Sequence, residues 1–373
     1  MERYINIVDY HQRKNNQLEI FDRHVKDTPT CRYPWTHLVI NQFGTTYICQ
    51  SPAWLAKGVG SLLDHNDFFD LLNSHEAQSI RSEISLGRYS YCNHKICSHL
   101  LHNKNLQLLP QQPEDLILLT KDQFTADSIV TTLPIEICFD FDYTCNFKCP
   151  SCRTDMINHN QGPLWESNRL LVEKIKHVII DRYIKTGDPV TFRWAGGEPF
   201  VSKAYLELWK YIIVTGNKKI RNIIQTNGSY LSKRTGILLK FLPYINVLRI
   251  SFDAGTPTTY EKVRANGNWN TLIKNSKQVR AMINNNKFKT KLISDFVVQL
   301  DNYQEIPTYI EIAKSIGFDS IQLSTMWNWG TWEMDEFNQL NISDPTHPKH
   351  QDLIDILNVY ANDLQVNQHV SKA

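Results

Sequence analysis

Residues 135–152 read IEICFDFDYTCNFKCPSC. The first part, Ile135–Phe141, has apolar side chains at every second position, which predicts a half-buried β-strand. The second part holds Cys145, Cys149 and Cys152 in a C-x3-C-x2-C spacing. We therefore expect a cysteine loop at the carboxyl end of a strand, where α/β folds carry their functional residues.

The three cysteines of this loop form a candidate metal site. Three thiolates can ligate three irons of a [4Fe–4S] cube and leave the fourth iron open, as a catalytic metal centre requires. Zinc is the alternative, with His159 as its fourth ligand. The spacing alone leaves both metals possible.

Strand-like and helix-like segments alternate from Thr131 onward. Strands are predicted at Ile135–Phe141, Val190–Trp194, Ile220–Gln225, Val247–Phe252, Lys291–Leu300 and Ser320–Leu323. Helices are predicted between them, at Leu170–Ile184, Lys203–Thr215, Lys233–Phe241, Trp269–Asn284 and Ile306–Ile316. This alternation predicts a parallel sheet with right-handed crossovers.

Short motifs follow the predicted strands in a fixed order. They read AGGEP at 195–199, QTNG at 225–228, SFD at 251–253 and NWGT at 328–331, with Arg264 in the segment TYEKVRANGNW. Together with CNFKCPSC, these motifs resemble those of the radical S-adenosylmethionine (SAM) superfamily, over about residues 135–331. One residue departs from the pattern: Ser151 stands where the family often has an aromatic residue near the adenine.

The resemblance implies a role for each motif residue. Glu198 and the backbone of Gly196 and Gly197 would hold the methionine amino group of SAM, because glycines let backbone approach a ligand closely. The remaining implied SAM contacts are the turn at Thr226 and Asn227, the ribose- and carboxylate-binding Ser251 and Asp253, and the carboxylate-binding Arg264.

The resemblance also implies the chemistry. One electron from a reductant such as flavodoxin or ferredoxin enters the [4Fe–4S] cluster, and SAM splits into methionine and a 5′-deoxyadenosyl radical. That radical removes a hydrogen atom from the substrate, so the protein's task is mainly to position the substrate and exclude water.

Four further cysteines precede this region, Cys31, Cys49, Cys92 and Cys97. Their spacing and the surrounding sequence segments CRYPW and GRYSYC resemble those of the SPASM and twitch domains that hold auxiliary [4Fe–4S] clusters. Such a domain normally follows the radical SAM core, and the fuller SPASM form has more cysteines. We therefore expect one auxiliary cluster that is fully ligated by protein and serves electron transfer or architecture. A structural zinc site and unrelated thiols are the alternatives.

The predicted fold class is α/β, a partial (β/α)6 radical SAM barrel preceded by a small cysteine-rich α+β domain. The expected division is an N-terminal lead-in at 1–30, the auxiliary-cluster domain at 31–109, a linker at 110–130, the radical SAM core at 131–345, and a C-terminal helix and tail at 346–373. Cys138 lies in the first core strand, where a small buried hydrophobe is the common role. The sharper alternative is a hydrogen-atom donor that quenches a substrate radical.

The composition limits the classes of molecule that the protein is expected to bind. The formal charge is +2, from 40 basic and 38 acidic residues, which indicates no broad field for nucleic acid or acidic membrane. No signal peptide or membrane span is evident, so we expect a cytoplasmic protein. The first hypothesis for the substrate is a ribosomally made peptide that receives a cross-link, thioether or epimerisation. Trp194, Trp327, Trp329 and Trp332 are candidate groove residues, and for at least two of them core or rim packing is the expected role instead. The alternatives are dehydrogenation or epimerisation of a sugar or aminocyclitol, and a non-catalytic iron–sulfur or zinc protein.

Overall fold

The structure is a computed structural model that describes residues 31–94, 97, 100 and 128–370. The chain forms two compact units. The first comprises residues up to Phe141 together with Arg169–Thr191, and the second comprises Asp142–Asn168 and residues from Phe192 onward. The first unit thus joins the N-terminal cysteine segment to the strand that sequence analysis placed at the start of the core.

The first unit contains a small mixed sheet in the order β4-β1-β2-β3. Strand β1 (His37–Asn41) pairs in parallel with β4 (Glu136–Asp140) and antiparallel with β2 (Thr45–Tyr47), which in turn pairs with β3 (Gly60–Ser61). The helices of this unit include α2 (Tyr33–Thr36), α3 (Phe68–Leu72), α4 (His75–Ser85) and α7 (Asp181–Thr186), together with the short helical segments 62–64 and 175–180. Helix α6 (Gly162–Lys174) also ends in this unit. The buried guanidinium of Arg81 ties the unit together by donating to three backbone carbonyls.

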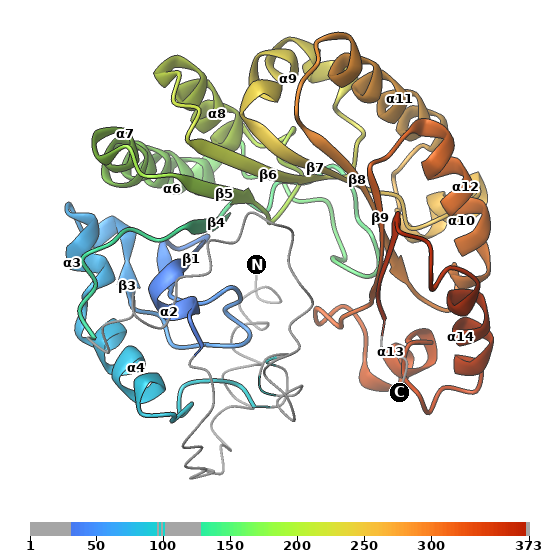
Figure 1. The fold of residues 1–373 in the computed structure, drawn as a ribbon, viewed down its shortest axis with the longest axis horizontal. Coiled ribbons are helices and arrows are strands. Elements are labelled where there is room, and N and C mark those ends of the chain that lie inside the picture. The colour runs from blue at the N-terminus through green and yellow to red at the C-terminus, as the bar shows by residue number, and fades with distance from the viewer. Residues whose placement is uncertain (1–30, 95–96, 98–99, 101–127, 371–373) are drawn as a thin grey trace. The chain divides into compact units, whose positions relative to one another are not determined.

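The second unit carries the main parallel sheet, in the order β10-β9-β8-β7-β6-β5. Its strands are β5 (Val190–Trp194, which begins in the first unit), β6 (Ile220–Thr226), β7 (Ile245–Ser251), β8 (Lys291–Val298), β9 (Ser320–Thr325) and β10 (Val366–His369). Its helices are α8 (Lys203–Thr215), α9 (Thr235–Phe241), α10 (Pro257–Val263), α11 (Trp269–Asn285), α12 (Ile306–Ile316), α13 (Met334–Leu340) and α14 (His350–Val359). Helices α8, α9, α11 and α12 cover one face of the strands β6 to β9 (Figure 1).

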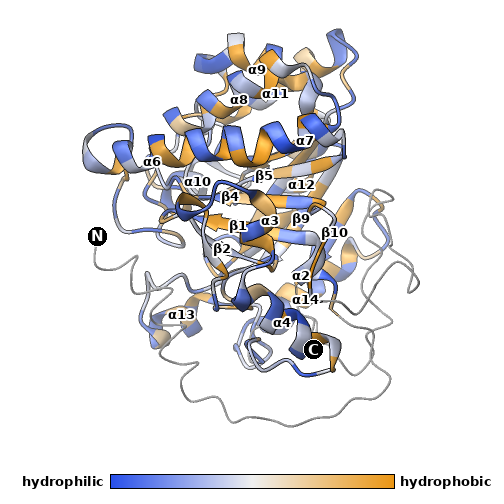
Figure 2. Ribbon diagram, turned by 90° about the vertical axis from the view of Figure 1, so that its left-hand side faces the viewer, coloured by the Kyte–Doolittle hydropathy of each residue, from blue (hydrophilic) through white to orange (hydrophobic). Residues whose placement is uncertain are grey.

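Local signals explain where these elements begin and end. Helix α8 begins at the N-cap Ser202, whose hydroxyl accepts from the Tyr205 N–H, and ends at the left-handed Gly216. Helix α12 ends in the same way at Gly317, with a φ of 89°. In Figure 2, helices such as α8 and α11 carry both hydrophilic and hydrophobic residues, as expected when one helix face packs on a sheet.

The predicted fold class is confirmed: the sheet is mixed, with mostly parallel strands, and it is consistent with a radical SAM (β/α) barrel. All the strands predicted after Thr131 form, with ends within two residues of the predicted ones. In this part of the chain, one strand was not predicted. The C-terminal segment contains not only helix α14 but also β10, which pairs in parallel with β9.

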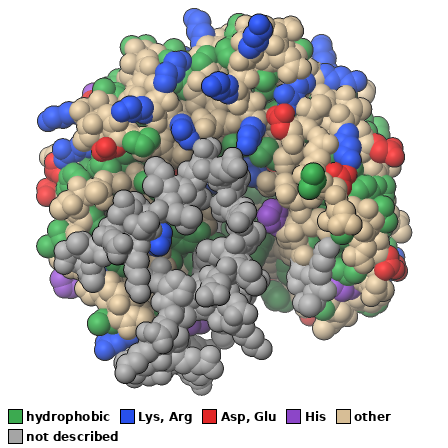
Figure 3. Space-filling view, viewed as in Figure 1, with side chains coloured by type: hydrophobic (Ala, Val, Ile, Leu, Met, Phe, Trp, Pro, Cys, Tyr) green, Lys and Arg blue, Asp and Glu red, His purple; other side chains and the backbone are tan. Residues whose placement is uncertain are grey.

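Among the described residues, no helix combines the length and the apolar character needed to cross a membrane. Lys and Arg side chains are scattered over the outer helices of the second unit, with Asp and Glu side chains among them (Figure 3).

Candidate active site

The cysteine loop lies in the second unit and follows strand β4 in the chain. Cys145 exchanges backbone hydrogen bonds with Ile157, with N–O distances of 2.8 and 3.3 Å, which closes the loop at its base. The Cys149 carbonyl accepts from the N–H groups of Cys152 and Arg153 at 2.9 and 3.0 Å. None of the three cysteines is in a disulfide; Cys145 and Cys149 are buried, and Cys152 is half-buried.

A short segment after β5 lies against this loop. The N–H groups of Gly197 and Glu198 donate to the carbonyls of Asp142 and Thr144, at 3.0 and 2.7 Å. A Cβ at position 197 would lie 2.0 Å from the Thr144 oxygen, so this approach is possible only for glycine. The cysteine loop and the Gly-Gly-Glu segment are therefore one hydrogen-bonded assembly.

Glu198 connects this assembly to the turn after β6. Its carboxylate is buried and accepts from the Thr226 hydroxyl at 2.6 Å, the Asn227 N–H at 2.6 Å and the Phe200 N–H at 3.1 Å. Burial raises the pKa of Glu198, and these three donors oppose the rise. A carboxylate has about four acceptor positions, so one remains on Glu198 for a further donor.

Asp253 and Arg264 form a buried ion pair beyond β7. The Arg264 Nη1 lies 3.1 Å from Asp253 Oδ2, and Oδ1 accepts from the Val297 N–H at 2.7 Å. Asp253 holds a positive φ of 59°, which a non-glycine residue seldom adopts. The Arg264 Nε is buried and has no hydrogen-bond partner among the described residues. Ser251 is buried at the end of β7.

Arg264 also faces the cysteine loop. Burial disfavours its charge, but the neighbouring Cys149 and Asp253 outweigh that effect and raise the pKa of Arg264. The Lys148 N–H donates to the Ala265 carbonyl at 3.1 Å, so the loop is bonded to the residue after this arginine. The structure thus brings the cysteine triplet, the Gly-Gly-Glu segment, the Thr226–Asn227 turn and the Asp253–Arg264 pair into one region of the second unit.

His159, the alternative zinc ligand, points toward a different partner. Its Nδ1 lies 3.6 Å from Oδ1 of the buried Asp142, and its backbone N–H donates to the Thr144 hydroxyl at 2.9 Å. Within the described ranges, no group of three or more His, Cys, Asp or Glu side chains is placed to hold a single metal ion.

The four N-terminal cysteines converge in the first unit. None of these cysteines, Cys31, Cys49, Cys92 and Cys97, is in a disulfide, and all four line one small cavity. Its other walls are formed by Tyr33, Pro34, Trp54, Leu55, Ile84, Tyr89 and Leu100. Burial raises the pKa of Cys31 and of Cys49 to about 12. Residues far apart in sequence are therefore gathered around one apolar site.

The remaining candidates are Cys138 and four tryptophans. Cys138 is half-buried in β4 of the first unit. The expectation that Trp194 lines a groove is wrong: its side chain is fully buried, and its indole N–H donates to Asn222 at 2.9 Å. Trp327 and Trp329, after β9, are 54% and 48% exposed. Trp332 packs near the ring of Phe337.

Sequence reasoning missed two charged groups near the site. Arg153 donates to the Cys152 sulfur at 3.3 Å and to the Tyr143 carbonyl at 3.0 Å, so its charge lies beside the loop. Its position directly after the last cysteine was the available signal. Arg249 and Asp295 form an ion pair across β7 and β8, and nothing in the local sequence indicates that pairing.

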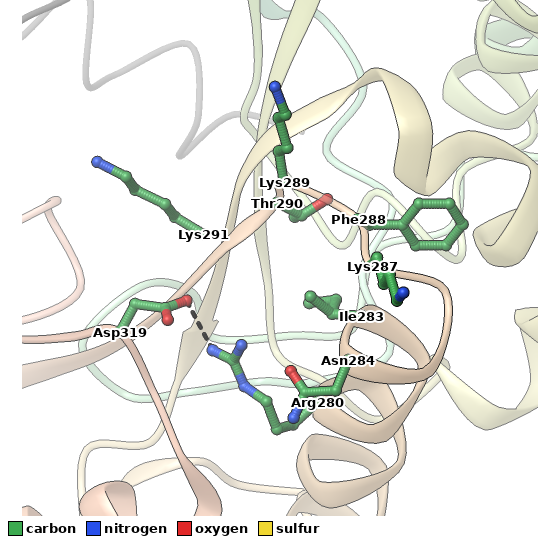
Figure 4. Close-up of a pocket in the computed structure, with 9 residues that line it drawn as sticks. All are labelled: Arg280, Ile283, Asn284, Lys287, Phe288, Lys289, Thr290, Lys291 and Asp319. Carbon is green, nitrogen blue, oxygen red and sulfur yellow. Dashed lines mark hydrogen bonds and ion pairs between the residues drawn. The ribbon is translucent and has the colours of Figure 1, made fainter.

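A second concave region lies at the other end of the strands. It is a surface pocket of about 480 Å³, formed by α11, the following loop and the starts of β8 and β9. Arg280 turns toward Asp319, at 2.6 Å, while Lys289 and Lys291 point away from this pair (Figure 4). The pocket lies at the amino-terminal ends of the strands, so it is separate from the site around Asp253.

Comparison with known proteins agrees with this geometry. Residues 141–313 match the model of the Radical SAM superfamily. A protein of Saccharolobus islandicus named "Probable GTP 3',8-cyclase" is 25% identical over 183 residues, which are 48% of this chain and 53% of that protein. The chain thus spans about half the length of the curated relatives it matches.

Solved structures with a similar fold include SuiB of Streptococcus suis bound to the precursor peptide SuiA. It has 15% identity and a TM-score of 0.43, covering 64% of this chain and 50% of that one. Native anSMEcpe with bound AdoMet has 16% identity and a TM-score of 0.37, covering 63% of this chain and 62% of that one. These scores are too low to support a conclusion about substrate.

Proposed function

We propose that this chain binds a [4Fe–4S] cluster through Cys145, Cys149 and Cys152 and cleaves SAM reductively, because residues 141–313 match the model of the Radical SAM superfamily. The observation that carries the proposal is the hydrogen-bonded assembly of the cysteine loop with Gly197 and Glu198.

The residues present fit these two groups. Three thiols on one loop, without a fourth cysteine, suit three irons of a cube whose last iron stays open. The buried Arg264 Nε lacks a partner among the described residues, and a carboxylate such as that of SAM would satisfy it. When bound, the cluster and SAM supply the electron transfer and the 5′-deoxyadenosyl radical.

The chain's own residues prepare the site for this chemistry. Glu198 keeps one acceptor position and suits an ammonium group, while its other contacts fix the turn at Thr226 and Asn227. Asp253 orients Arg264. Arg153 donates to the Cys152 sulfur, which helps to hold that side chain in place.

We also propose that Cys31, Cys49, Cys92 and Cys97 hold one auxiliary [4Fe–4S] cluster. Four cysteines that form no disulfide and line one apolar cavity are a suitable donor set, and they leave no open position for substrate. The same set suits a structural zinc ion. Iron analysis separates the two: after anaerobic reconstitution we expect about eight irons per chain, and about four if this second site holds zinc.

The proposed substrate is a peptide that undergoes cross-linking, thioether formation or epimerisation. A cross-link removes two electrons overall, and the auxiliary cluster would accept the second. The exposed Trp327 and Trp329, directly after β9, offer contacts for apolar side chains. In an epimerisation, Cys138 would return a hydrogen atom to the substrate. A flavodoxin- or ferredoxin-type protein would supply the first electron.

The test is formation of 5′-deoxyadenosine from SAM under dithionite, with the anaerobically reconstituted chain. Cys149→Ala should abolish it, whereas Thr154→Ala, an exposed position after the same loop, should not. Cys92→Ala should retain part of SAM cleavage and lose product formation. Undiminished cleavage by Cys149→Ala would overturn the proposed cluster site.

A further inference from the structure

The two faces of the main sheet differ sharply in chemistry. Side chains alternate between faces along each strand, and partners in a parallel pair share a face. The face that helices α8 to α12 cover carries buried apolar residues such as Ile224, Leu248, Phe296 and Leu323. The registered partners on the opposite face are largely polar; they include Gln225, Arg249, Ser251, Asp295, Gln322, Ser324, Asn367 and His369.

Four of these residues form what we call the polar row: Arg249 on β7, Asp295 on β8, Gln322 on β9 and His369 on β10. Arg249 Nε donates to Asp295 Oδ2 at 2.9 Å, and Nη2 bonds both Asp295 Oδ1 and Gln322 Oε1. His369 lies within electrostatic range of both Arg249 and Asp295. The row therefore crosses four adjacent strands.

Folding does not require such a row. Burying an ion pair removes two charges from water, and well-packed apolar residues usually stabilise a sheet face as well or better. The Asp295 side chain is only 7% exposed, so this cost is present here. A polar network that surrounds a buried carboxylate, and whose other members remain partly accessible, is a candidate for ligand recognition.

The polar row begins beside the proposed SAM site. Asp295 is the registered partner of Ser251, and its carbonyl accepts from the Phe252 N–H at 2.9 Å. Two residues further along β8, the Val297 N–H donates to Asp253 at 2.7 Å. A molecule bound along the row would have one end next to the residues assigned to the ribose and carboxylate of SAM.

The chemistry of the row favours an uncharged, hydrogen-bonding ligand. The charges of Arg249 and Asp295 cancel within the pair. Burial and the Arg249 charge lower the pKa of His369, which keeps its ring neutral near pH 7. Since Gln322 accepts through Oε1, its NH2 group is left to donate. The row thus lacks the excess positive charge that a nucleoside triphosphate would need.

The length of the row favours an extended chain. Three strand spacings of about 4.8 Å separate β7 from β10. The row is also staggered: Asp295 lies two residues beyond Ile293, the partner of Arg249, and His369 lies two residues beyond the partner of Gln322. It therefore also advances about 13 Å along the strands, so the row is roughly 20 Å long, about six residues of extended peptide at about 3.3 Å each. A peptide main chain offers one donor and one acceptor per residue along such a length.

We propose that the polar row binds the main-chain amides of a peptide substrate, over about six extended residues, and aligns it with the reacting carbon of SAM. This inference rests on the proposed function, because it assigns the substrate class of the same site.

The test measures binding to the reconstituted chain with SAM present, by equilibrium dialysis of a pool of N-acetylated, C-amidated hexapeptides without charged side chains. GTP and the neutral disaccharide maltose serve as competing probes. Gln322→Leu and His369→Leu remove hydrogen-bonding groups without stranding a charge. Gln351→Leu, at an exposed position on α14, is the matched control. Thermal melting checks that each variant is folded.

We expect the peptides to bind and each row variant to bind them about threefold to tenfold less tightly, the loss typical of one uncharged hydrogen bond. The control should bind like the unaltered chain. Equal peptide binding by folded row variants would overturn the inference, as would binding of GTP or maltose that the row substitutions weaken. SAM cleavage is measured separately: its absence in the unaltered chain refutes the proposed function, whereas cleavage without peptide binding refutes only the polar row.

Discussion

Gly197 offers the sharpest test of how the site is built, because Gly197→Ala adds a single methyl group. The new Cβ would lie 2.0 Å from the Thr144 oxygen and 2.6 Å from the Thr144 and Tyr143 carbonyl carbons. All three are backbone atoms, so no side-chain rotation relieves the clash. The Gly-Gly-Glu segment must move away from the cysteine loop.

That movement breaks the two hydrogen bonds from Gly197 N and Glu198 N, which measure 3.0 and 2.7 Å. Each is worth about 1 kcal/mol net, and each buried group left without a partner costs about 1–3 kcal/mol. We therefore expect Gly197→Ala to lower the free energy of unfolding by about 2–6 kcal/mol. It should also weaken SAM binding, since Glu198 would no longer hold its position.

The assays are urea unfolding, iron content after anaerobic reconstitution, and SAM affinity by equilibrium dialysis. Gly236→Ala is the matched control: a Cβ there meets nothing within 4 Å, and the residue lies inside helix α9. Alanine should stabilise that helix by about 0.5–1 kcal/mol. If Gly197→Ala keeps the unfolding midpoint, iron content and SAM affinity of the unaltered chain, the close-approach argument is wrong.

Three further predictions concern other parts of the chain. Ser202→Ala removes both the N-cap of α8 and the hydroxyl that donates to the buried Asp142 at 2.5 Å, so urea unfolding should show a loss of about 2–4 kcal/mol. Arg81→Leu leaves three buried carbonyls without their donor and should cost about 3 kcal/mol or more; an unchanged melting temperature would contradict this. Burial lowers the pKa of His159, so the unfolded chain binds more protons below the ordinary pKa of about 6.5. The stabilising contribution of the neutral His159 ring is fully present above about pH 6.5 and is lost as the pH falls below it. His159→Gln should therefore flatten the acidic part of a plot of unfolding free energy against pH, measured by urea unfolding.

Much of the main sheet was predictable because its signals are local. Strand β5 and helices α8 and α12 have the predicted ends, since apolar periodicity, the N-cap Ser202 and the glycines 216 and 317 mark them in the sequence. Strand β10 (Val366–His369) was missed because it is short and most of its residues are polar. Only its pairing with β9 makes it a strand, and such long-range pairing leaves no local pattern.

The order of the motifs was enough to expect that their residues meet, because the carboxyl ends of parallel strands share one edge. The contacts between side chains on neighbouring strands were not predictable. The Arg249–Asp295 pair depends on the register of β7 against β8, which places Arg249 opposite Ile293 and diagonal to the aspartate. A shift of one residue would send either side chain to the apolar face. Trp194 was misassigned for the same reason: its place in β5 was correct, but the face it occupies was not visible in the sequence.

The hydrogen bonds between the loops that carry Glu198, Asp253 and Arg264 affect the free energy of SAM binding. Glu198, Asp253 and Arg264 are held by neighbours from other loops before any ligand arrives. A site whose polar groups are already oriented loses little conformational entropy on binding, so more of the contact energy remains as affinity. Substitutions that loosen these loop-to-loop bonds without touching a SAM-contacting atom should therefore weaken SAM binding through added disorder. Such variants should show a more unfavourable binding entropy by calorimetry, whereas loss of a direct contact should appear mainly in the enthalpy.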